Sequence, residues 1–128
     1  MVRVFVITPT ATAEMHVTAS SDEGSISEFI NNAVGGWFDA VHPAYTDFNV
    51  VGYVHDEGLL LGLEPNPVAS AMFGRFLVGN VVVVGTLNAD GKYDGASHDV
   101  SDEAKQYLAW LCSAQQIWKD HLTEEPAV

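Results

Sequence analysis

The chain has 128 residues and is 48% hydrophobic, which suits one domain with a continuous core. Its formal net charge is -12, because 17 acidic residues stand against only five Lys and Arg, and these five are scattered along the sequence. Nucleic acids and anionic membranes attract clustered cations, so the composition argues against direct nucleic-acid binding and against binding to a membrane surface. No apolar run approaches the roughly 18 residues of a membrane span.

Cysteine content and the first residues bear on the compartment. Cys112 is the only cysteine, so neither an intramolecular disulfide nor a thiolate zinc cluster can form. The apolar stretch VRVFVI is too short for a signal peptide and contains Arg3. We therefore expect a cytoplasmic protein in which residues 1–128 form a single compact domain, with the last few residues as a frayed tail.

The N-terminal part predicts two strands and a short helix. Residues 2–8 are rich in β-branched side chains and suit a strand buried on both faces, with residues 12–18 returning beside it. Ser25 and Glu28 form a capping-box pattern at the start of the helix. Apolar residues then recur at helical spacing until Gly35, which is expected to end the helix.

The central part predicts strands over residues 37–42 and 48–55, followed by a corner. Asp56-Glu57-Gly58 is typical of a hairpin turn, in which Gly58 tolerates a positive φ. Residues 59–63 would then pair back as another strand. After this corner, Asn66 is the expected cap of a short helix that has Pro67 at its first position and ends at Gly74.

The C-terminal part predicts one buried strand, one loop and one long helix. The four valines at 81–84 suit a strand inside the sheet, and residues 88–99 form the longest expected loop. A final helix over residues 101–122 starts at a Ser101 cap. The predicted fold is α+β, with a mixed, largely antiparallel sheet of about five strands, two short helices and one long C-terminal helix.

Three places bring an imidazole and a carboxylate close together in the sequence. They are Asp39 with His42, His55 with Asp56, and His98 with Asp99. Metal phosphohydrolases with a His-Asp pair hold it on helices together with further ligands, whereas both dipeptides here fall in expected turns or loops. The sequence also has no G-x-S-x-G, P-loop or G-x-G-x-x-G pattern. We expect no catalytic residues, no metal and no cofactor, and therefore no enzyme. A weaker alternative is an enzyme that uses His42, His55 or His98 with a metal ion.

The final helix has a wider apolar arc than one surface helix normally buries. Its expected core face comprises Ala104, Tyr107, Leu108, Leu111, Trp118 and Leu122. Beside that face lie Trp110, Ala114, Ile117 and His121. Two explanations stay open: a deep groove of the domain encloses the helix, or Trp110 and Ile117 protrude to bind a protein partner or a second copy in a homodimer.

Residues 35–85 resemble a known family in the order of several short elements. They run from Gly35-Gly36 through NVVGYVHDEGLLLGLEPNPVASAMFG to GNVVVVG. This order is similar to a family of small domains of unknown function, catalogue number 3846, found mostly in bacteriophages and their hosts. Glu64, inserted between Leu63 and Pro65, and the aromatic C-terminal helix depart from the family pattern. The resemblance implies a phage gene expressed in a bacterial cytoplasm, and it carries over no catalytic residue.

Three hypotheses follow for function. The first is a small acidic, phage-encoded protein that acts without catalysis by binding a host or phage protein. It would bind through its acidic surface, through the stripe of Trp110, Ala114, Ile117 and His121, or through both. The alternative is a small-ligand or nucleotide-binding module with a pocket near residues 56–66, whose ligand loop would contain Asp56, Glu57, Gly58 and Asn66. A weaker alternative is a DNA mimic that inhibits a DNA-binding protein, although the carboxylates are spread over turns and both ends of the chain.

Overall fold

The computed structural model describes residues 1–18, 26–44 and 48–124, with side chains as far as residue 116 in the last helix. The elements in chain order are β1 (Val2–Ile7), β2 (Thr12–Val17), α1 (Ser27–Val34), β3 (Phe38–Val41), β4 (Val50–His55), α2 (Pro67–Phe73), β5 (Val81–Leu87), β6 (Tyr93–His98) and α3 (Asp102–Glu124). The α+β prediction is confirmed, with two short helices and a long third one. The sheet has six strands, all paired antiparallel, where about five were expected.

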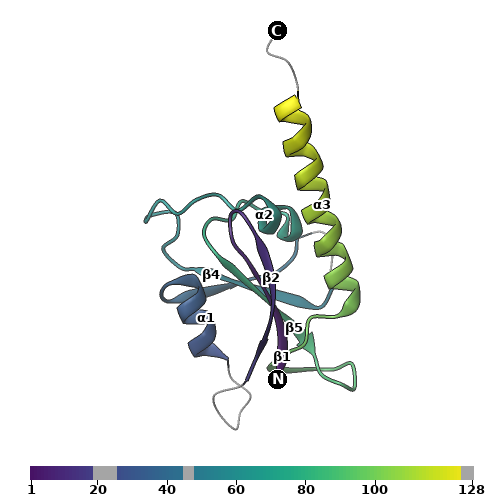
Figure 1. The fold of residues 1–128 in the computed structure, drawn as a ribbon. Helices are drawn as coiled ribbons and strands as arrows, with labels where there is room; N and C mark the ends of the chain where they lie inside the picture. Colours follow the sequence, from purple (N-terminus) through teal and green to yellow (C-terminus); the bar gives the residue numbers. More distant parts are fainter. Residues whose placement is uncertain (19–25, 45–47, 125–128) are drawn as a thin grey trace.

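Strand β5 lies at the centre of the sheet, as its valines predict. The strand order is β2-β1-β5-β4-β3, and β6 pairs with the end of β5 that β1 does not reach. Val81 and Val83 pack in the core beneath α2 and α3, whereas Val82 and Val84 pack in the core beneath α1. The helices therefore cover both faces of the sheet (Figure 1), which explains why all four valines are fully buried.

The strand predicted over residues 59–63 is wrong, because residues 59–62 form turns and Leu63 has no regular structure. A strand that returns from β4 would need a free edge of β4. Both edges are already occupied, one by β3 and the other by β5. The chain instead closes local hydrogen bonds, from Leu61 N–H to Glu57 O and from Leu63 N–H to Gly58 O.

The loop predicted over residues 88–99 is also wrong in part, because residues 93–98 form β6. The side chain of Asn88 accepts hydrogen bonds from the N–H groups of Asp90 and Lys92, and Gly91 has a φ of 74°. The polar, glycine-rich composition thus builds a tight turn, which returns the chain to β5. Helix α1 ends at Gly35, with a φ of 89°, as predicted, while the expected capping residue Ser25 lies outside the described residues.

Asn66 connects α2 to two other parts of the fold. Its side-chain oxygen accepts a hydrogen bond from Ala69 N–H, at 3.1 Å, which confirms the predicted cap. Its side-chain nitrogen donates to Ile7 O in β1 and to Gly79 O before β5, both at 2.8 Å. The residue is fully buried, so these bonds replace water for the whole amide group.

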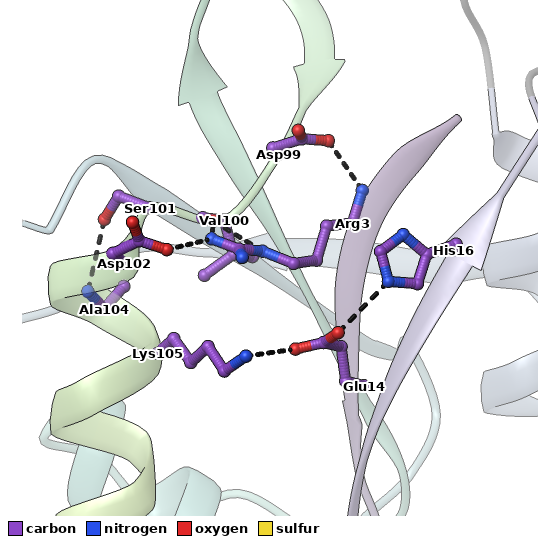
Figure 2. Close-up of polar contacts among 9 residues, drawn as sticks. All are labelled: Arg3, Glu14, His16, Asp99, Val100, Ser101, Asp102, Ala104 and Lys105. Atoms are coloured by element: carbon purple, nitrogen blue, oxygen red, sulfur yellow. Dashed lines mark hydrogen bonds and ion pairs between the residues drawn. The ribbon is translucent and has the colours of Figure 1, made fainter.

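The start of α3 is held against β1 by Arg3 (Figure 2). Its backbone N–H donates to the Asp99 carboxylate at 2.7 Å, and its guanidinium donates to Val100 O and to the Asp102 carboxylate at 2.9 Å. Ser101 caps the helix, as predicted, by accepting a hydrogen bond from Ala104 N–H. These contacts join the beginning of the chain to residues about one hundred positions later.

A second polar contact joins α3 to β2. The Glu14 carboxylate accepts hydrogen bonds from Lys105 Nζ at 2.8 Å and from His16 at 3.1 Å (Figure 2). The hydrogen bond from Lys105, followed by that from His16, holds the pKa of Glu14 below its usual value. A carboxyl group whose pKa is lowered by folding stabilises the fold above its unfolded pKa, and this contribution is lost as the pH falls through the folded pKa.

We predict that Asn66→Ala lowers the free energy of unfolding by about 3 kcal/mol, because it removes a helix cap and leaves buried backbone groups unpaired. Asn66→Asp keeps the cap but directs a carboxylate at two carbonyl oxygens, so at neutral pH it should cost at least as much. Urea unfolding followed by circular dichroism measures both, with Asn32→Ala on the exposed face of α1 as the control. Wild-type stability of Asn66→Asp would contradict the role of the donated bonds.

We predict that Lys105→Met raises the pKa of Glu14, because the first cause of its lowering is removed. The stability difference between wild type and variant should shrink as the pH falls below the usual glutamate pKa of about 4.3. Carboxyl-detected NMR titration measures the pKa directly. Lys92→Met, in the β5–β6 turn, removes the same charge and should leave Glu14 unchanged. An unaltered Glu14 titration in Lys105→Met would show that the hydrogen bond has no such effect.

Candidate functional site

An aromatic row leads from the core to the surface on α3. The rings of Phe48 and Tyr107 stack with centroids 4.8 Å apart, and those of Tyr107 and Trp110 stack at 6.1 Å with an interplanar angle of 16°. Phe48 and Tyr107 are half-buried against the main core, whereas Trp110 is 62% exposed. Tyr107 and Trp110 are neighbours because residues three apart share a face of a helix. The half-buried ring of Tyr107 therefore packs against the exposed indole of Trp110.

The predicted core face of α3 is confirmed as far as side chains are described. Ala104, Leu108 and Leu111 are buried, and Tyr107 is half-buried. Of the expected partner-binding residues, Trp110 is exposed and Ala114 is half-buried, one helical turn further along. The side chains of Ile117 and His121, and those of the expected core residues Trp118 and Leu122, lie outside the described ones. The backbone of α3 continues to Glu124, and its second half extends beyond the sheet (Figure 1).

A pocket of about 650 Å³ lies where β3 and the end of β4 meet the turn that follows β4. Its further wall is the segment 75–78, which follows α2. Three carboxylates line it, those of Asp39, Asp56 and Glu57, and Arg75 is the cation among its lining residues. The rim is apolar, with Leu59, Leu60 and Phe76 exposed by 72%, 87% and 64%.

Only part of the predicted ligand loop lies at this pocket. Asp56, Glu57 and Gly58 line it, whereas Asn66 does not and has its side chain fully engaged in the fold. Gly58 does not adopt the positive φ that was expected; in this turn Gly62 does, at 67°. Gly58 instead packs closely, because a Cβ atom there would lie 3.0 Å from the side chain of Val78, which would have to move slightly.

Sequence reasoning missed Asp39 as part of this site, together with Arg75 and Phe76. They come from an edge strand and from the loop after α2, and no local pattern relates them to the turn at residues 56–60. The sequence feature that could have indicated this site is the run Leu59-Leu60-Leu61 between two glycines. This run is compatible with a turn as well as with a strand. In the structure these leucines are exposed, which marks the segment as a surface feature.

Two of the histidines, His55 and His98, make local contacts with neighbouring residues. His55 Nδ1 accepts a hydrogen bond from Glu57 N–H at 3.0 Å and lies 3.5 Å from the Asp56 carboxylate. His98 donates to Asp94 at 2.6 Å, which holds the pKa of Asp94 below its usual value. The expected neighbour of His98, Asp99, instead accepts from Arg3. Within the parts of the chain that the structure describes, no group of three or more metal-binding side chains comes together.

Asp39 and His42 lie exposed in β3 and just after it. Cys112 is partly buried against the core, with its thiol 3.4 Å from the Thr12 hydroxyl, so it packs on the inner side of α3. Among the described residues, none of the helices combines the length and the apolar content needed to cross a bilayer.

The family match agrees with the resemblance seen in the sequence. The family model described as Domain of unknown function (DUF3846) matches residues 2–110, which include the whole sheet and the first part of α3. No curated protein and no solved structure matches the chain. Because the family model covers most of its length, this chain belongs to the DUF3846 family of domains of unknown function.

Proposed function

We propose that this chain acts without catalysis, by binding a bacteriophage or host protein in the bacterial cytoplasm. The observation that supports this proposal is Trp110, a large aromatic side chain that is 62% exposed and stacked on the half-buried Tyr107. Tryptophan is among the residues most enriched at the centres of protein interfaces. An indole that is already oriented by stacking loses little conformational freedom when a partner covers it.

The position of Trp110 on α3 adds to this argument. The helix extends past the sheet (Figure 1), so its second half offers a partner an approach that the sheet does not obstruct. The family match ends at Trp110, and the remainder of α3 lies beyond it. By sequence, Ala114, Ile117 and His121 continue the same side of the helix at spacings of four, three and four. This stripe is the partner-binding surface that we propose.

The charge of the chain favours a basic partner. A net charge of -12 produces a long-range potential that accelerates encounter with a positively charged surface. DNA mimicry, the special case in which the partner is a DNA-binding protein, remains a weaker proposal. It requires a row of unpaired carboxylates, but Glu14, Asp94 and Asp102 each bind a neighbouring side chain of this protein.

A second candidate function is the binding of a small ligand in the pocket of about 650 Å³, a volume within the usual range of ligand sites. The three carboxylates in its lining would repel the phosphates of a nucleotide, so a cationic or neutral ligand suits it better. Native mass spectrometry of the purified chain tests this candidate. A retained small mass favours it, and a mass equal to that of the bare chain in every preparation argues against it.

We predict that Trp110→Ala weakens binding to a protein partner by about thirtyfold, which corresponds to the 2 kcal/mol typical of an interface hot spot. Affinity purification from lysates of phage-infected bacteria identifies the partner, and calorimetry with the purified partner measures the loss. Trp37→Ala is the matched control, because Trp37 is 79% exposed and is not on α3. The expected result is a partner that wild type and Trp37→Ala retain and Trp110→Ala loses.

Sedimentation equilibrium of the three proteins distinguishes a homodimer from a foreign partner. If wild type and Trp37→Ala are dimers and Trp110→Ala is a monomer, the partner is a second copy of the chain. The proposal is wrong if all three are monomers that retain no partner, or if all three retain the same partner equally.

A further inference from the structure

We propose that the pocket beside β3 accepts an extended, basic segment of a partner protein, which pairs with the free edge of β3 as an additional strand. This surface differs from the Trp110 stripe, and the inference does not depend on the function proposed above. It rests on three observations: an open strand edge, an excess of carboxylates beside it and an exposed apolar rim.

The open edge follows from the register of β3 and β4. Phe38 lies opposite His55, and Asp56 N–H donates to Trp37 O at 3.0 Å. In an antiparallel pair, residues alternate between bonding to the partner strand and pointing away from it. Residues 37, 39 and 41 therefore face β4, and the N–H and C=O groups of Phe38 and Ala40 point outward. Among the described residues no strand pairs with this edge, and Ala40 lines the pocket.

The charges beside this edge determine which charge the side chains of the added segment should carry. Asp39, Asp56 and Glu57 place three carboxylates in the lining against the single guanidinium of Arg75. A segment with Lys or Arg side chains complements this excess, and an acidic segment is repelled. Asp39 also disfavours pairing between the β3 edges of two copies, because that arrangement would bring like charges together.

The rim determines what the remaining side chains of the segment should be. Leu59, Leu60 and Phe76 are exposed on the same pocket, so apolar side chains of the segment can pack against them. Side chains of a strand alternate between faces, so cations and apolar groups would occupy the positions that point into the pocket. A small organic cation would leave the open backbone groups and the exposed leucines uncovered. The combination favours strand addition, in which main-chain hydrogen bonds supply affinity and pockets supply specificity.

The test uses the full chain, labelled with nitrogen-15, and a synthetic peptide with the sequence Lys-Thr-Leu-Thr-Lys-Thr-Leu-Thr, blocked at both ends. We expect binding at or below about 1 mM, a value typical of weak peptide recognition. Binding should slow amide hydrogen exchange at Phe38 and Ala40, whose N–H groups become paired, and leave Asp39 unchanged. The same peptide with Glu in place of Lys should not bind.

Two peptides N-methylated at alternate residues provide a matched control. Only every second amide of an added strand faces β3, so one of these peptides should bind and the other should not. In the chain, Ala40→Pro removes an outward N–H without breaking a bond to β4 and should raise the Kd at least about tenfold. Circular dichroism checks that this variant folds, and the N-methylated peptides decide the question if it does not.

Charge variants complete the design. Asp39→Asn combined with Asp56→Asn should weaken binding several-fold, whereas Asp90→Asn combined with Glu103→Gln changes the net charge equally at exposed positions outside the pocket and should have no effect. Trp110→Ala should bind the peptide like wild type, because Trp110 lies outside this pocket. The peptide experiment can therefore fail without contradicting the function proposed for Trp110, and the reverse also holds. The inference is overturned if the lysine peptide does not bind, if the glutamate peptide binds equally, or if both N-methylated peptides bind.

Discussion

The buried side-chain amide of Asn66 is the contact on which the arrangement of both candidate surfaces depends. Its oxygen accepts the capping hydrogen bond of α2, and its nitrogen donates two hydrogen bonds, one to β1 and one to the chain before β5. Beside it, Asn66 N–H donates to Leu77 O, and Gly79 N–H donates to Glu64 O. The segment 75–78 is therefore held next to the corner that follows β4. Asn66 does not line the pocket, yet it positions one of its walls.

Helix α2 also connects the pocket to α3, because its side chains pack in the same core as those of α3. Phe73, at the end of α2, is fully buried and lies directly over Gly52 of β4, where a Cβ atom would come within 2.6 Å of its ring. Phe73 belongs to the same core as Leu108 and Leu111 of α3. A rigid core of this kind fixes the face of α3 that turns inward, and thereby the direction in which Trp110 points outward.

Two sets of charged groups have different roles in the protein. One set joins α3 to the first two strands: Arg3 binds Asp99 and Asp102, and Glu14 binds Lys105 (Figure 2). Both cations in that set are engaged by carboxylates, so it offers little charge to a partner. The other set surrounds the pocket, where carboxylates outnumber cations and a strand edge is open. The carboxylates that line the pocket therefore outnumber the cations there by three to one.

The sequence determined the elements whose signals are local. The Asn66 cap with Pro67, the glycines that end α1 and α2, the Ser101 cap and the valines of β5 were all predicted, because each follows from the conformational preferences of neighbouring residues. The strand expected over residues 59–63 failed because pairing depends on whether an edge of β4 is free, which its own residues do not encode. Strand β6 was missed for the same reason, because residues 93–98 form a strand by pairing with β5, and their own sequence does not show this pairing.

For the candidate surfaces, the sequence identified Asp56, Glu57 and Gly58 as a turn and placed Trp110 beside the core stripe of its helix. Only the tertiary structure brought Asp39 and Arg75 to that turn, because they lie on segments that meet through the order of the strands. Only the tertiary structure showed that Trp110 is uncovered, because helical periodicity gives the direction of a side chain but not what lies opposite it.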